Sequence, residues 1–459
     1  MIFENMISNA VYNQVERNSL NRKTDIEMDA IADNIKTKYL NNEYDFSKMD
    51  TLILNQNGKK RLVKQYETYS VENILCICIK QVLDKVYKIK YVNRNKTIHN
   101  LFGILSAIPQ MQEFTIVKFD FKDFFNSISS EYVFEYSIRD RLINRNDLDL
   151  VKKFCSEIKY AYAGLPTSNI IAEIIAKSFD ERLKKKLPAN NVVFYERYID
   201  DCLIILNTNV ELTDIKEILD STLKEVFFID YEDVTKCKAK FSSKKFQYIS
   251  HRQLSNCSKE SNDSTVFNYL GYEFTFVLDK KSKVVINYGI TQDKINKYTK
   301  KMDKIISIYK DEKDLELLKH RIECFCSREV YLCRYYKTYL WKVKGFISNY
   351  CELRYLLDTD LIDAKTKLFL ENVVIDAFKR AGIPTPIFLK NSEKQKGFNL
   401  LNNMRGYKTI LMVEKVGYDY QSLCKRCEKI GISRIDENGN ERTYETLVRL
   451  YLIKTNVGY

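Results

Sequence analysis

Two adjacent carboxylates, Asp200 and Asp201, are the residues of this chain best suited to chemistry. Apolar and aromatic runs flank them at 192–195 and 203–206, a pattern that predicts two short β-strands joined by a tight turn. Two neighbouring anions repel each other, and a turn can form without them. A divalent metal ion beside them is one interpretation, because Mg²⁺ prefers carboxylate oxygen as a ligand. A solvated acidic turn is the other.

The segments around this hairpin alternate between strand and helix patterns. Residues 114–121 form an apolar, β-prone run that contains Asp120, and 168–186 has apolar residues at helical spacing. After the hairpin, 211–226 has a helical pattern and 227–231 is strand-like. This βαββαβ order predicts a ferredoxin-like layer, an antiparallel sheet with helices on one face. It also places Asp120 on a strand that neighbours the hairpin.

Three carboxylates that converge in this way suit nucleotidyl transfer. Asp120, Asp200 and Asp201 would hold two Mg²⁺ ions, with Mn²⁺ as an alternative, about 4 Å apart against a triphosphate and a primer hydroxyl. The metals lower the pKa of the attacking hydroxyl and neutralise charge on the leaving pyrophosphate. The sequence therefore predicts an enzyme that transfers nucleotides.

The composition fits a folded protein with an anionic partner. The chain has 459 residues, 45% of them hydrophobic and 13% aromatic, which is enough for two or three domains. Its formal charge of +13 suits nucleic acid. No run of about 18 apolar residues and no signal peptide is found, so no membrane span is expected. The cysteines follow no disulfide framework, and we expect a cytoplasmic protein with reduced thiols.

Four motifs of this chain resemble those of bacterial reverse transcriptases, in order and spacing, over residues 60–275. The resemblance implies a right-hand polymerase with palm and fingers, of α+β class, and the activity of an RNA-directed DNA polymerase that uses dNTPs. The matching segments are Phe119-Asp120-Phe121-Lys122-Asp123-Phe124-Phe125-Asn126-Ser127-Ile128, Gly164-Leu165-Pro166-Thr167-Ser168, Tyr198-Ile199-Asp200-Asp201 and Tyr269-Leu270-Gly271-Tyr272.

The resemblance also assigns roles to single residues. The carbonyl of Phe121 joins Asp120, Asp200 and Asp201 as a metal ligand. The nucleotide site takes the remaining roles: the backbone of Asp123 meets the triphosphate, the ring of Phe125 excludes a 2′-hydroxyl, and Gly164 marks the second motif. For Phe125, plain core packing is a compatible alternative.

Basic residues are weaker candidates for the same site. Lys60 and Arg61 are candidates for fingers contacts to the phosphates, although solvated surface explains them nearly as well. One of Lys236, Lys238 and Lys240 is a candidate general acid for the pyrophosphate, and the sequence does not distinguish among them.

One departure from the family pattern points to a subtype. Ala163 stands where these enzymes typically carry Gln, directly before Gly164. The altered motif and the long helical tail resemble the abortive-infection reverse transcriptases of phage defence, prophage-encoded type. That resemblance implies untemplated DNA synthesis primed on a protein tyrosine, a single-stranded DNA product attached to the protein, and a homo-oligomer. The candidate priming residues are Tyr44, Tyr12 and Tyr39.

The predicted organisation has three parts. Residues 1–112 form a helical extension and fingers, 113–278 form the palm, and 279–459 form an all-helical, HEAT-like domain in place of the thumb. The leading hypothesis is protein-primed, untemplated DNA synthesis in antiviral defence by bacteria. A retron-type reverse transcriptase copying an RNA, and a nucleic-acid-binding scaffold without catalysis, are the alternatives.

Overall fold

The computed structural model describes residues 2–18, 23–56, 59–227, 239–256, 265–280, 283–335, 338–390 and 398–456. The chain divides into two compact units. The first unit comprises Met1–Thr97 and Gln110–Ser258, and the second comprises Ile98–Pro109 and Lys259–Tyr459. No helix in the described ranges has the length and apolar character needed to cross a membrane.

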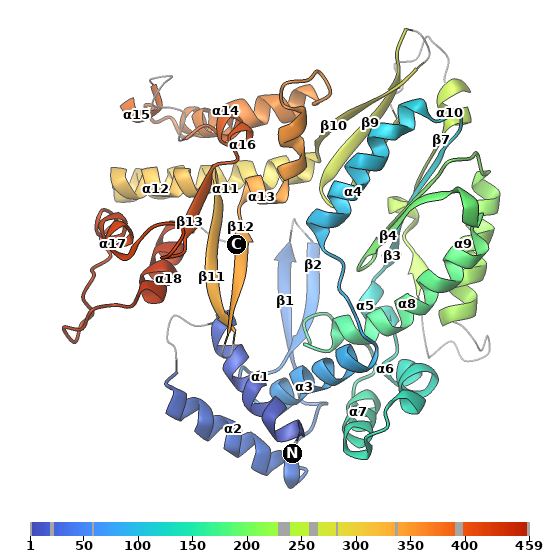
Figure 1. The fold of residues 1–459 in the computed structure, drawn as a ribbon, viewed down its shortest axis with the longest axis horizontal. Helices are drawn as coiled ribbons and strands as arrows, with labels where there is room; N and C mark the ends of the chain where they lie inside the picture. Colours follow the sequence, from blue (N-terminus) through green and yellow to red (C-terminus); the bar gives the residue numbers. More distant parts are fainter. Residues whose placement is uncertain are drawn as a thin grey trace. The chain divides into compact units, whose positions relative to one another are not determined.

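The first unit combines helices with a hairpin and a mixed-length antiparallel sheet (Figure 1). Its elements are α1 (Ile2–Asn18), α2 (Asp25–Leu40), β1 (Asp50–Gln56), β2 (Lys59–Gln65), α3 (Val71–Val86), β3 (Thr115–Lys122), α5 (Phe124–Ser127), α6 (Ser130–Val133), a π-helix (Phe134–Ile138), a 3₁₀ turn (Arg139–Arg141), α7 (Arg145–Glu157), α8 (Ser168–Lys186), a second 3₁₀ turn (Ala189–Asn191), β4 (Val192–Tyr198), β5 (Asp201–Leu206), α9 (Leu212–Phe227), β6 (Lys240–Phe241), a third 3₁₀ turn (Ser243–Lys245), β7 (Gln247–Ser250) and α10 (His251–Asn256).

The sheet has the strand order β4-β5-β3, with β6 and β7 both pairing antiparallel with β3. This is the order expected of a ferredoxin-like layer, so the prediction is confirmed for its first three strands, which are β3, β4 and β5. The predicted strand at 227–231 falls outside the described residues, apart from Phe227, which ends α9. In the described residues, the strands that pair with β3 besides β5 are β6 and β7, which follow later in the chain.

Phenylalanine rings cover one face of this sheet. Phe121 on β3 packs at ring-centroid distances of 5.2 Å from Phe179 on α8 and 5.8 Å from Phe227 on α9. Helices α8 and α9 lie side by side in Figure 1. Successive strand residues face opposite sides, so Asp120, between Phe119 and Phe121, points away from this aromatic layer. The core thus fixes the face of the sheet on which Asp120 lies.

The second unit contains a long helix pair and two three-stranded sheets, of order β10-β9-β8 and β12-β11-β13. Helices α11 and α14 pack against each other. Its elements are α4 (Arg94–Ala107), which begins at the end of the first unit, a 3₁₀ turn (Ile108–Gln110), β8 (Thr265–Tyr269), β9 (Tyr272–Leu278), β10 (Val284–Ile290), α11 (Gln292–Glu312), α12 (Leu315–Phe325), β11 (Arg328–Tyr335), β12 (Thr338–Lys344), α13 (Phe346–Asn349), a 3₁₀ helix (Cys351–Leu356), α14 (Ala364–Ala381), α15 (Ile387–Lys390), α16 (Leu400–Arg405), β13 (Thr409–Met412), α17 (Tyr420–Glu428) and α18 (Tyr444–Thr455).

The prediction of an all-helical segment at 279–459 is wrong, because this segment contains β10, β11, β12 and β13. Strands β11 and β12 pair along their whole length, with Leu332 opposite Trp341. Short apolar runs fit helix and strand patterns equally well, and the partner strand that decides between them is not visible in local spacing. The HEAT-like arrangement and the three-part division of the chain stay predictions.

A buried polar cluster in the second unit centres on Tyr451. The Nε of Arg426 donates to the Tyr451 hydroxyl at 2.8 Å, which leaves the hydroxyl proton for Nδ1 of His320 at 2.9 Å. Arg426 is also paired with Glu323. Burial, followed by the charge of Arg426, lowers the pKa of His320 to about 4. The imidazole is therefore neutral in the folded protein at neutral pH.

This neutral histidine predicts a loss of stability in acid. Between its unfolded pKa near 6.5 and its folded pKa near 4, the unfolded chain binds more protons, so the free energy of unfolding falls as the pH drops. The expected loss is up to about 3 kcal/mol. Urea unfolding at pH 7.5 and pH 5 should show it, and His320→Asn, which keeps an acceptor for Tyr451 but does not titrate, should show less of it. An equal pH dependence in both proteins would contradict this assignment.

Candidate active site

The three predicted carboxylates come together at one end of the sheet. Asp120 on β3 lies directly opposite Asp201, the first residue of β5, in the antiparallel register. Asp200 belongs to the two-residue turn, Ile199 and Asp200, that joins β4 to β5; we call it the hairpin turn. The amide of Phe121 donates to the carbonyl oxygen of Asp200 at 3.2 Å, which ties this turn to β3.

Two lysines that sequence reasoning missed neutralise part of this charge. Nζ of Lys245 lies 2.6 Å from Oδ2 of Asp120, and Nζ of Lys118 lies 3.0 Å from Oδ1 of Asp201. Lys118 is two residues before Asp120 on β3, so strand alternation alone placed it on the same face and gave a signal for it. Lys245 lies 125 residues after Asp120 and had no such signal.

The carboxylates lie in a partly dehydrated environment. Burial, and then the charge of Asp120, raise the pKa of Asp200 to about 6. Burial also raises the pKa of Asp120, although Lys245 opposes the shift. Burial alone would lower the pKa of Lys245, but its hydrogen bond to Asp120 and the charges of the three carboxylates outweigh burial and raise it. The site therefore has unbalanced negative charge that a cation would stabilise.

The donor set fits Mg²⁺ by its chemistry. Oδ1 of Asp201 is buried and has no partner of hydrogen-bond geometry, even though the Lys118 ammonium is 3.0 Å away. Within the described ranges, no three His, Cys, Asp or Glu side chains are placed so that they alone could enclose a metal. Mg²⁺ does not need such a cage, because it is usually held by one or two carboxylates, water and substrate phosphates. Asp120, Asp200, Asp201 and the carbonyl of Phe121 are thus the candidate ligands.

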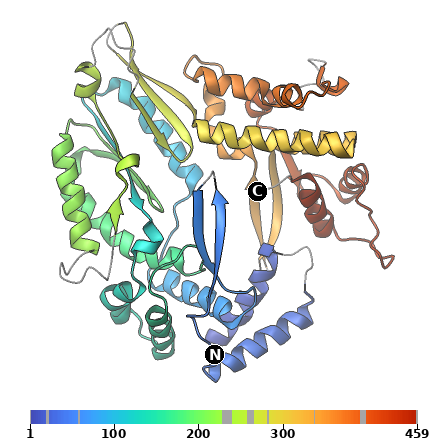
Figure 2. The ribbon, with the colours of Figure 1, turned by 180° about the vertical axis from the view of Figure 1, so that it is seen from behind.

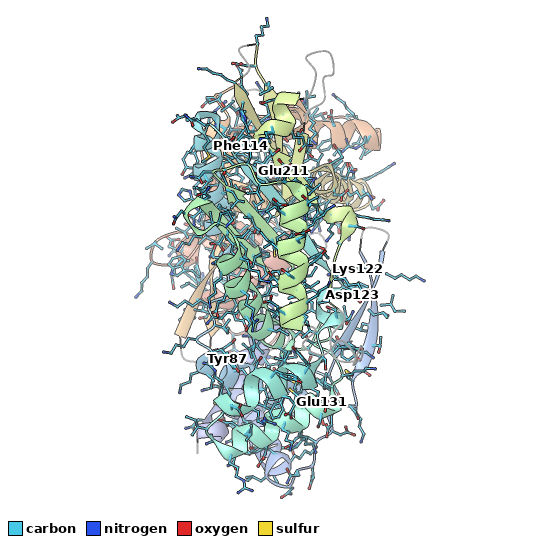
Figure 3. All side chains as sticks on the ribbon, turned by 90° about the vertical axis from the view of Figure 1, so that its right-hand side faces the viewer. Tyr87, Phe114, Lys122, Asp123, Glu131 and Glu211 are labelled. Atoms are coloured by element: carbon cyan, nitrogen blue, oxygen red, sulfur yellow. The ribbon has the colours of Figure 1, made fainter. Side chains whose placement is uncertain are left out.

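The chain turns sharply after β3, at the position predicted to meet the triphosphate. Asp123 has a left-handed backbone (φ +50°) and directly precedes α5. Figure 3 labels it next to Lys122, the last residue of β3. Its carboxylate accepts a hydrogen bond from Nδ2 of Asn126 at 2.8 Å. A non-glycine residue in this conformation is uncommon and occurs often at functional sites. Asp123 is an exposed residue, and its carbonyl oxygen accepts a hydrogen bond from the amide of Ser127 at 3.0 Å.

Phe125 lines a pocket of about 180 Å³ in the first unit. It packs at 5.6 Å from the ring of Phe124 and is partly buried, so packing and a gating role are compatible for it. The hairpin turn reaches this pocket through Tyr198 and Ile199. The other lining residues are Tyr91, Val92, Asn169, Ala172 and Glu173.

Gly164 joins the second motif to the β1–β2 hairpin. Its φ of +107° disfavours any side chain, and an added Cβ would lie 2.2 Å from Cγ1 of Val63 and 2.4 Å from the carbonyl oxygen of Lys64. The amide of Lys64 donates to the carbonyl of Ala163 at 2.9 Å. Gly164 is therefore required for close packing of β2. Its place in the nucleotide site stays a prediction.

The two basic candidates, Lys60 and Arg61, lie on opposite faces of β2. Lys60 and Arg61 are both exposed, on the two-stranded ribbon visible in Figure 2. Because side chains alternate along a strand, Arg61 shares its face with Val63, which contacts Gly164, whereas Lys60 lies on the other face. Arg61 is the better placed of the two to reach a nucleotide bound beside the second motif.

We therefore expect Arg61→Ala to raise the KM for dNTPs by about tenfold, with Lys60→Ala changing it by less than about threefold. A guanidinium that contacts phosphate contributes to substrate binding, and an ammonium on the opposite face contributes only through long-range charge. Steady-state incorporation at fixed primer concentration measures both constants. Equal effects of the two substitutions would contradict the assignment by face.

The three candidate priming tyrosines all pack against the core of the first unit. The hydroxyl of Tyr12 donates to Oδ1 of Asp29 at 2.9 Å, and the rings of Tyr39 and Tyr44 stack at 6.1 Å. Burial, followed by Tyr39 and Glu157, raises the pKa of Tyr44 to about 12. This makes the Tyr44 hydroxyl harder to deprotonate than a free tyrosine, and the priming role of all three stays a prediction.

Two further groups of sequence candidates remain, of which Lys240 pairs with Lys122 at the end of β3. The Tyr269–Tyr272 motif forms the tight turn between β8 and β9 in the second unit, with left-handed backbone at Leu270 (φ +49°) and Gly271 (φ +87°). Of the three general-acid candidates, Lys236 and Lys238 fall outside the described residues, and Lys240 begins β6.

Comparison with known proteins identifies the domain that carries the carboxylates. Residues 56–274 match the family described as reverse transcriptase (RNA-dependent DNA polymerase). The retron Ec73 reverse transcriptase of Escherichia coli is 39% identical over 124 residues, which cover 24% of this chain and 38% of that protein. The retron Ec83 reverse transcriptase of the same species is 28% identical over 184 residues, which cover 38% of this chain and 58% of that protein. Residues 56–274 of this chain are therefore similar to a reverse-transcriptase domain, and the segment that matches combines helices and strands.

Both matches are partial, since this chain spans less than two thirds of the length of either relative. Among solved structures, an apo telomerase from Candida tropicalis, truncated from the C-terminal domain, is 12% identical and matches with a TM-score of 0.32. That match covers 57% of this chain and 61% of the telomerase chain. A score this low does not establish a common fold.

Proposed function

We propose that this chain is a DNA polymerase of the reverse-transcriptase type, which joins dNTPs by two-metal nucleotidyl transfer. The observation that carries the proposal is the register of Asp120 opposite Asp201, with Asp200 in the adjoining hairpin turn. The reverse-transcriptase domain at 56–274 contains all three residues. A scaffold without catalysis gives no reason for three carboxylates to converge in a partly dehydrated site.

The residues divide the work of the reaction among them. When bound, two Mg²⁺ ions supply activation of the primer hydroxyl and charge neutralisation at the leaving pyrophosphate. Asp120, Asp200 and Asp201 would hold these ions, together with the Phe121 carbonyl. Lys245 and Lys118 keep the carboxylates close together by reducing their mutual repulsion.

The nucleotide is positioned by groups on both sides of the carboxylates. The backbone of Asp123 would bind the triphosphate, and Arg61 on β2 would contact a phosphate from the fingers side. The ring of Phe125 would lie against the sugar, where a 2′-hydroxyl has no room.

The role of Phe125 predicts a change in sugar selection. Phe125→Ala should reduce the preference for dNTPs over rNTPs by about tenfold or more, because removing the ring makes room for a 2′-hydroxyl. Competing incorporation of dCTP and CTP by the wild type and the variant measures this ratio. An unchanged ratio would leave Phe125 with a packing role only.

For the template, the relatives favour RNA. Both curated relatives are named retron reverse transcriptases, and their similarity lies within the domain that carries the carboxylates. This supports an enzyme that copies an RNA. A homo-oligomeric state and a cytoplasmic location are further proposals for this chain, and so is its mode of priming.

A second candidate, untemplated synthesis primed on a protein tyrosine in abortive-infection defence, is favoured by Ala163. The typical Gln at this position packs against the incoming nucleotide. The methyl side chain of Ala163 cannot make the contacts of a glutamine side chain. The backbone carbonyl of Ala163 accepts a hydrogen bond from the amide of Lys64. A weaker hold on the paired nucleotide would suit synthesis without a template.

One experiment separates these candidates. The purified full chain is incubated with dNTPs and Mg²⁺, with no primer or template, and then with a primed RNA. DNA attached to the protein in the first reaction supports the untemplated candidate, and mass spectrometry of the linked peptide tests Tyr12, Tyr39 and Tyr44. Synthesis only on the RNA supports the retron-type candidate. No synthesis in either reaction, without specific Mg²⁺ binding by calorimetry, would favour the scaffold.

A further inference from the structure

Arg197, three residues before Asp200, is buried and uses every hydrogen-bond donor of its guanidinium. Nε donates to both oxygens of Asp180, at 3.0 and 3.1 Å. Nη2 donates to Oδ2 of Asp180 at 2.9 Å and to Oε2 of Glu173 at 2.6 Å. Nη1 donates to Oε1 of Glu173 at 3.0 Å and to the carbonyl oxygen of Ile199 at 2.9 Å.

The last of these bonds reaches the hairpin turn itself. Ile199 has a φ of +61°, a left-handed conformation that a β-branched side chain adopts only when its surroundings impose it. The bond from Arg197 is made to the peptide that joins Ile199 to Asp200. The turn is therefore held from the β4 side by Arg197 and from the β3 side by the Phe121 amide, which donates to the Asp200 carbonyl at 3.2 Å.

The two carboxylates that hold Arg197 belong to one rigid element. Glu173 and Asp180 are seven residues apart on α8, so they lie on the same helix face. Asp180 also accepts a hydrogen bond from the hydroxyl of Tyr195 on β4 at 2.6 Å. Helix α8 packs its Phe179 ring on the sheet, as described above. The planar guanidinium of Arg197 thus connects the hairpin turn to the packed helix α8 and fixes the position of the turn relative to that helix.

We propose that Arg197 is a positioning residue for the metal-binding carboxylates. Its guanidinium, oriented by Glu173 and Asp180, holds the strained Ile199 peptide and so places the side chain of Asp200. The alternative is that this buried ion cluster contributes to folding stability alone. This inference rests on the proposed function for its catalytic meaning, but metal binding tests it separately.

The central variant is Arg197→Lys, which keeps the charge and loses the fork. A lysine ammonium has three donors and cannot serve two carboxylates and a carbonyl in one plane. The matched control is Arg182→Lys, at an exposed arginine of α8, the helix that carries Glu173 and Asp180. Arg182 pairs with Glu225 at 3.3 Å. Circular dichroism and the thermal midpoint report folding, and titration with Mn²⁺ reports metal affinity without requiring activity.

The expected result is a change in metal dependence. In folded Arg197→Lys, the Mn²⁺ dissociation constant and the half-saturating Mg²⁺ concentration should each rise about tenfold, and kcat should fall about tenfold or more, because a displaced ligand weakens both. The KM for dNTPs should change by less than about threefold. Arg182→Lys should behave as the wild type. A folded Arg197→Lys protein with wild-type metal affinity and kcat would overturn the proposal.

A second pair of variants tests the strained turn. Ile199→Asn introduces the residue type that best tolerates a left-handed backbone, so the turn needs less restraint. In this background, Arg197→Lys should weaken Mn²⁺ binding by less than half of its tenfold effect, a coupling that a general loss of stability does not produce. Additive effects would overturn the positioning role.

Three further outcomes distinguish the positioning role of Arg197 from the proposed polymerase function. Should Arg197→Lys prove unfolded, Glu173→Gln, which keeps an acceptor and loses one charge, must shift Mn²⁺ affinity in the same direction by a smaller factor; no shift overturns the proposal. If the wild type binds Mn²⁺ and Arg197→Lys binds it more weakly, but neither makes DNA, the proposed function fails and the positioning role holds. If the wild type binds no Mn²⁺, both fail.

Discussion

Replacing Asp200 by Asn is expected to reduce Mg²⁺-dependent DNA synthesis by about a thousandfold or more, because the variant loses a charged ligand of the reacting centre. The protein should stay folded. The pKa of Asp200 is raised to about 6. Above that pH the side chain is ionised in the folded protein, and this charge lowers the free energy of unfolding. A neutral amide of the same size removes this penalty, and the metal-free variant should unfold at the same or a higher temperature than the wild type.

The matched control for this prediction is Asp220→Asn, the same chemical change at an exposed position of α9 in the same unit. It should leave synthesis within about twofold of the wild type, as surface substitutions usually do. Primer extension with labelled dNTPs, together with thermal unfolding in EDTA, measures both effects. An Asp200→Asn protein that retains full synthesis would remove the carboxylates from the mechanism.

Gly164→Ala is expected to have the largest effect on stability. A Cβ at this position would overlap Cγ1 of Val63 and the carbonyl oxygen of Lys64, and φ of +107° is unfavourable for alanine. The combined strain and overpacking should lower the free energy of unfolding by about 2 to 5 kcal/mol. Because β2 must move to relieve the overlap, Arg61 should also move, and the KM for dNTPs should rise in any protein that stays folded.

Gly103→Ala is the control for this change. Gly103 lies within α4, and no atom lies within 4 Å of the position its Cβ would take. Alanine there should be neutral or stabilising by up to about 1 kcal/mol. Urea unfolding of the two variants compares them directly. Equal stabilities of Gly164→Ala and Gly103→Ala would show that β2 does not pack on Gly164 as described.

The sheet and its carboxylates were predictable from the sequence because local patterns determine them. Alternation located the hairpin, although its turn is Ile199 and Asp200 and not the two carboxylates Asp200 and Asp201, and the βαββαβ order placed Asp120 beside it. Register then follows from burying the Phe119 and Phe121 face. Each of these steps depends on residues that are close in sequence or on a rule of topology.

The partners of these residues were not predictable in the same way. Lys245 contacts Asp120 although 125 positions separate them in the sequence. The contacts of Arg197 depend on which face of α8 packs toward β4, and residue spacing alone does not determine that face. Strands β10 to β13 were missed because a strand is decided by its pairing partner as much as by its own residues. The half-buried position of Tyr44 does not follow from its polar neighbours in sequence, because the ring of Tyr39 and the ammonium of Lys153 pack against it in the fold.

Incorporation of labelled dNTPs by the purified full chain, with Mg²⁺ and with EDTA, tests the central claim most directly. The assay is run on a primed RNA and without any nucleic acid. The predicted result is polymeric DNA in at least one of these reactions with Mg²⁺, and none with EDTA. The absence of any incorporation with Mg²⁺ or Mn²⁺ under both conditions would contradict the assignment of Asp120, Asp200 and Asp201 to nucleotidyl transfer.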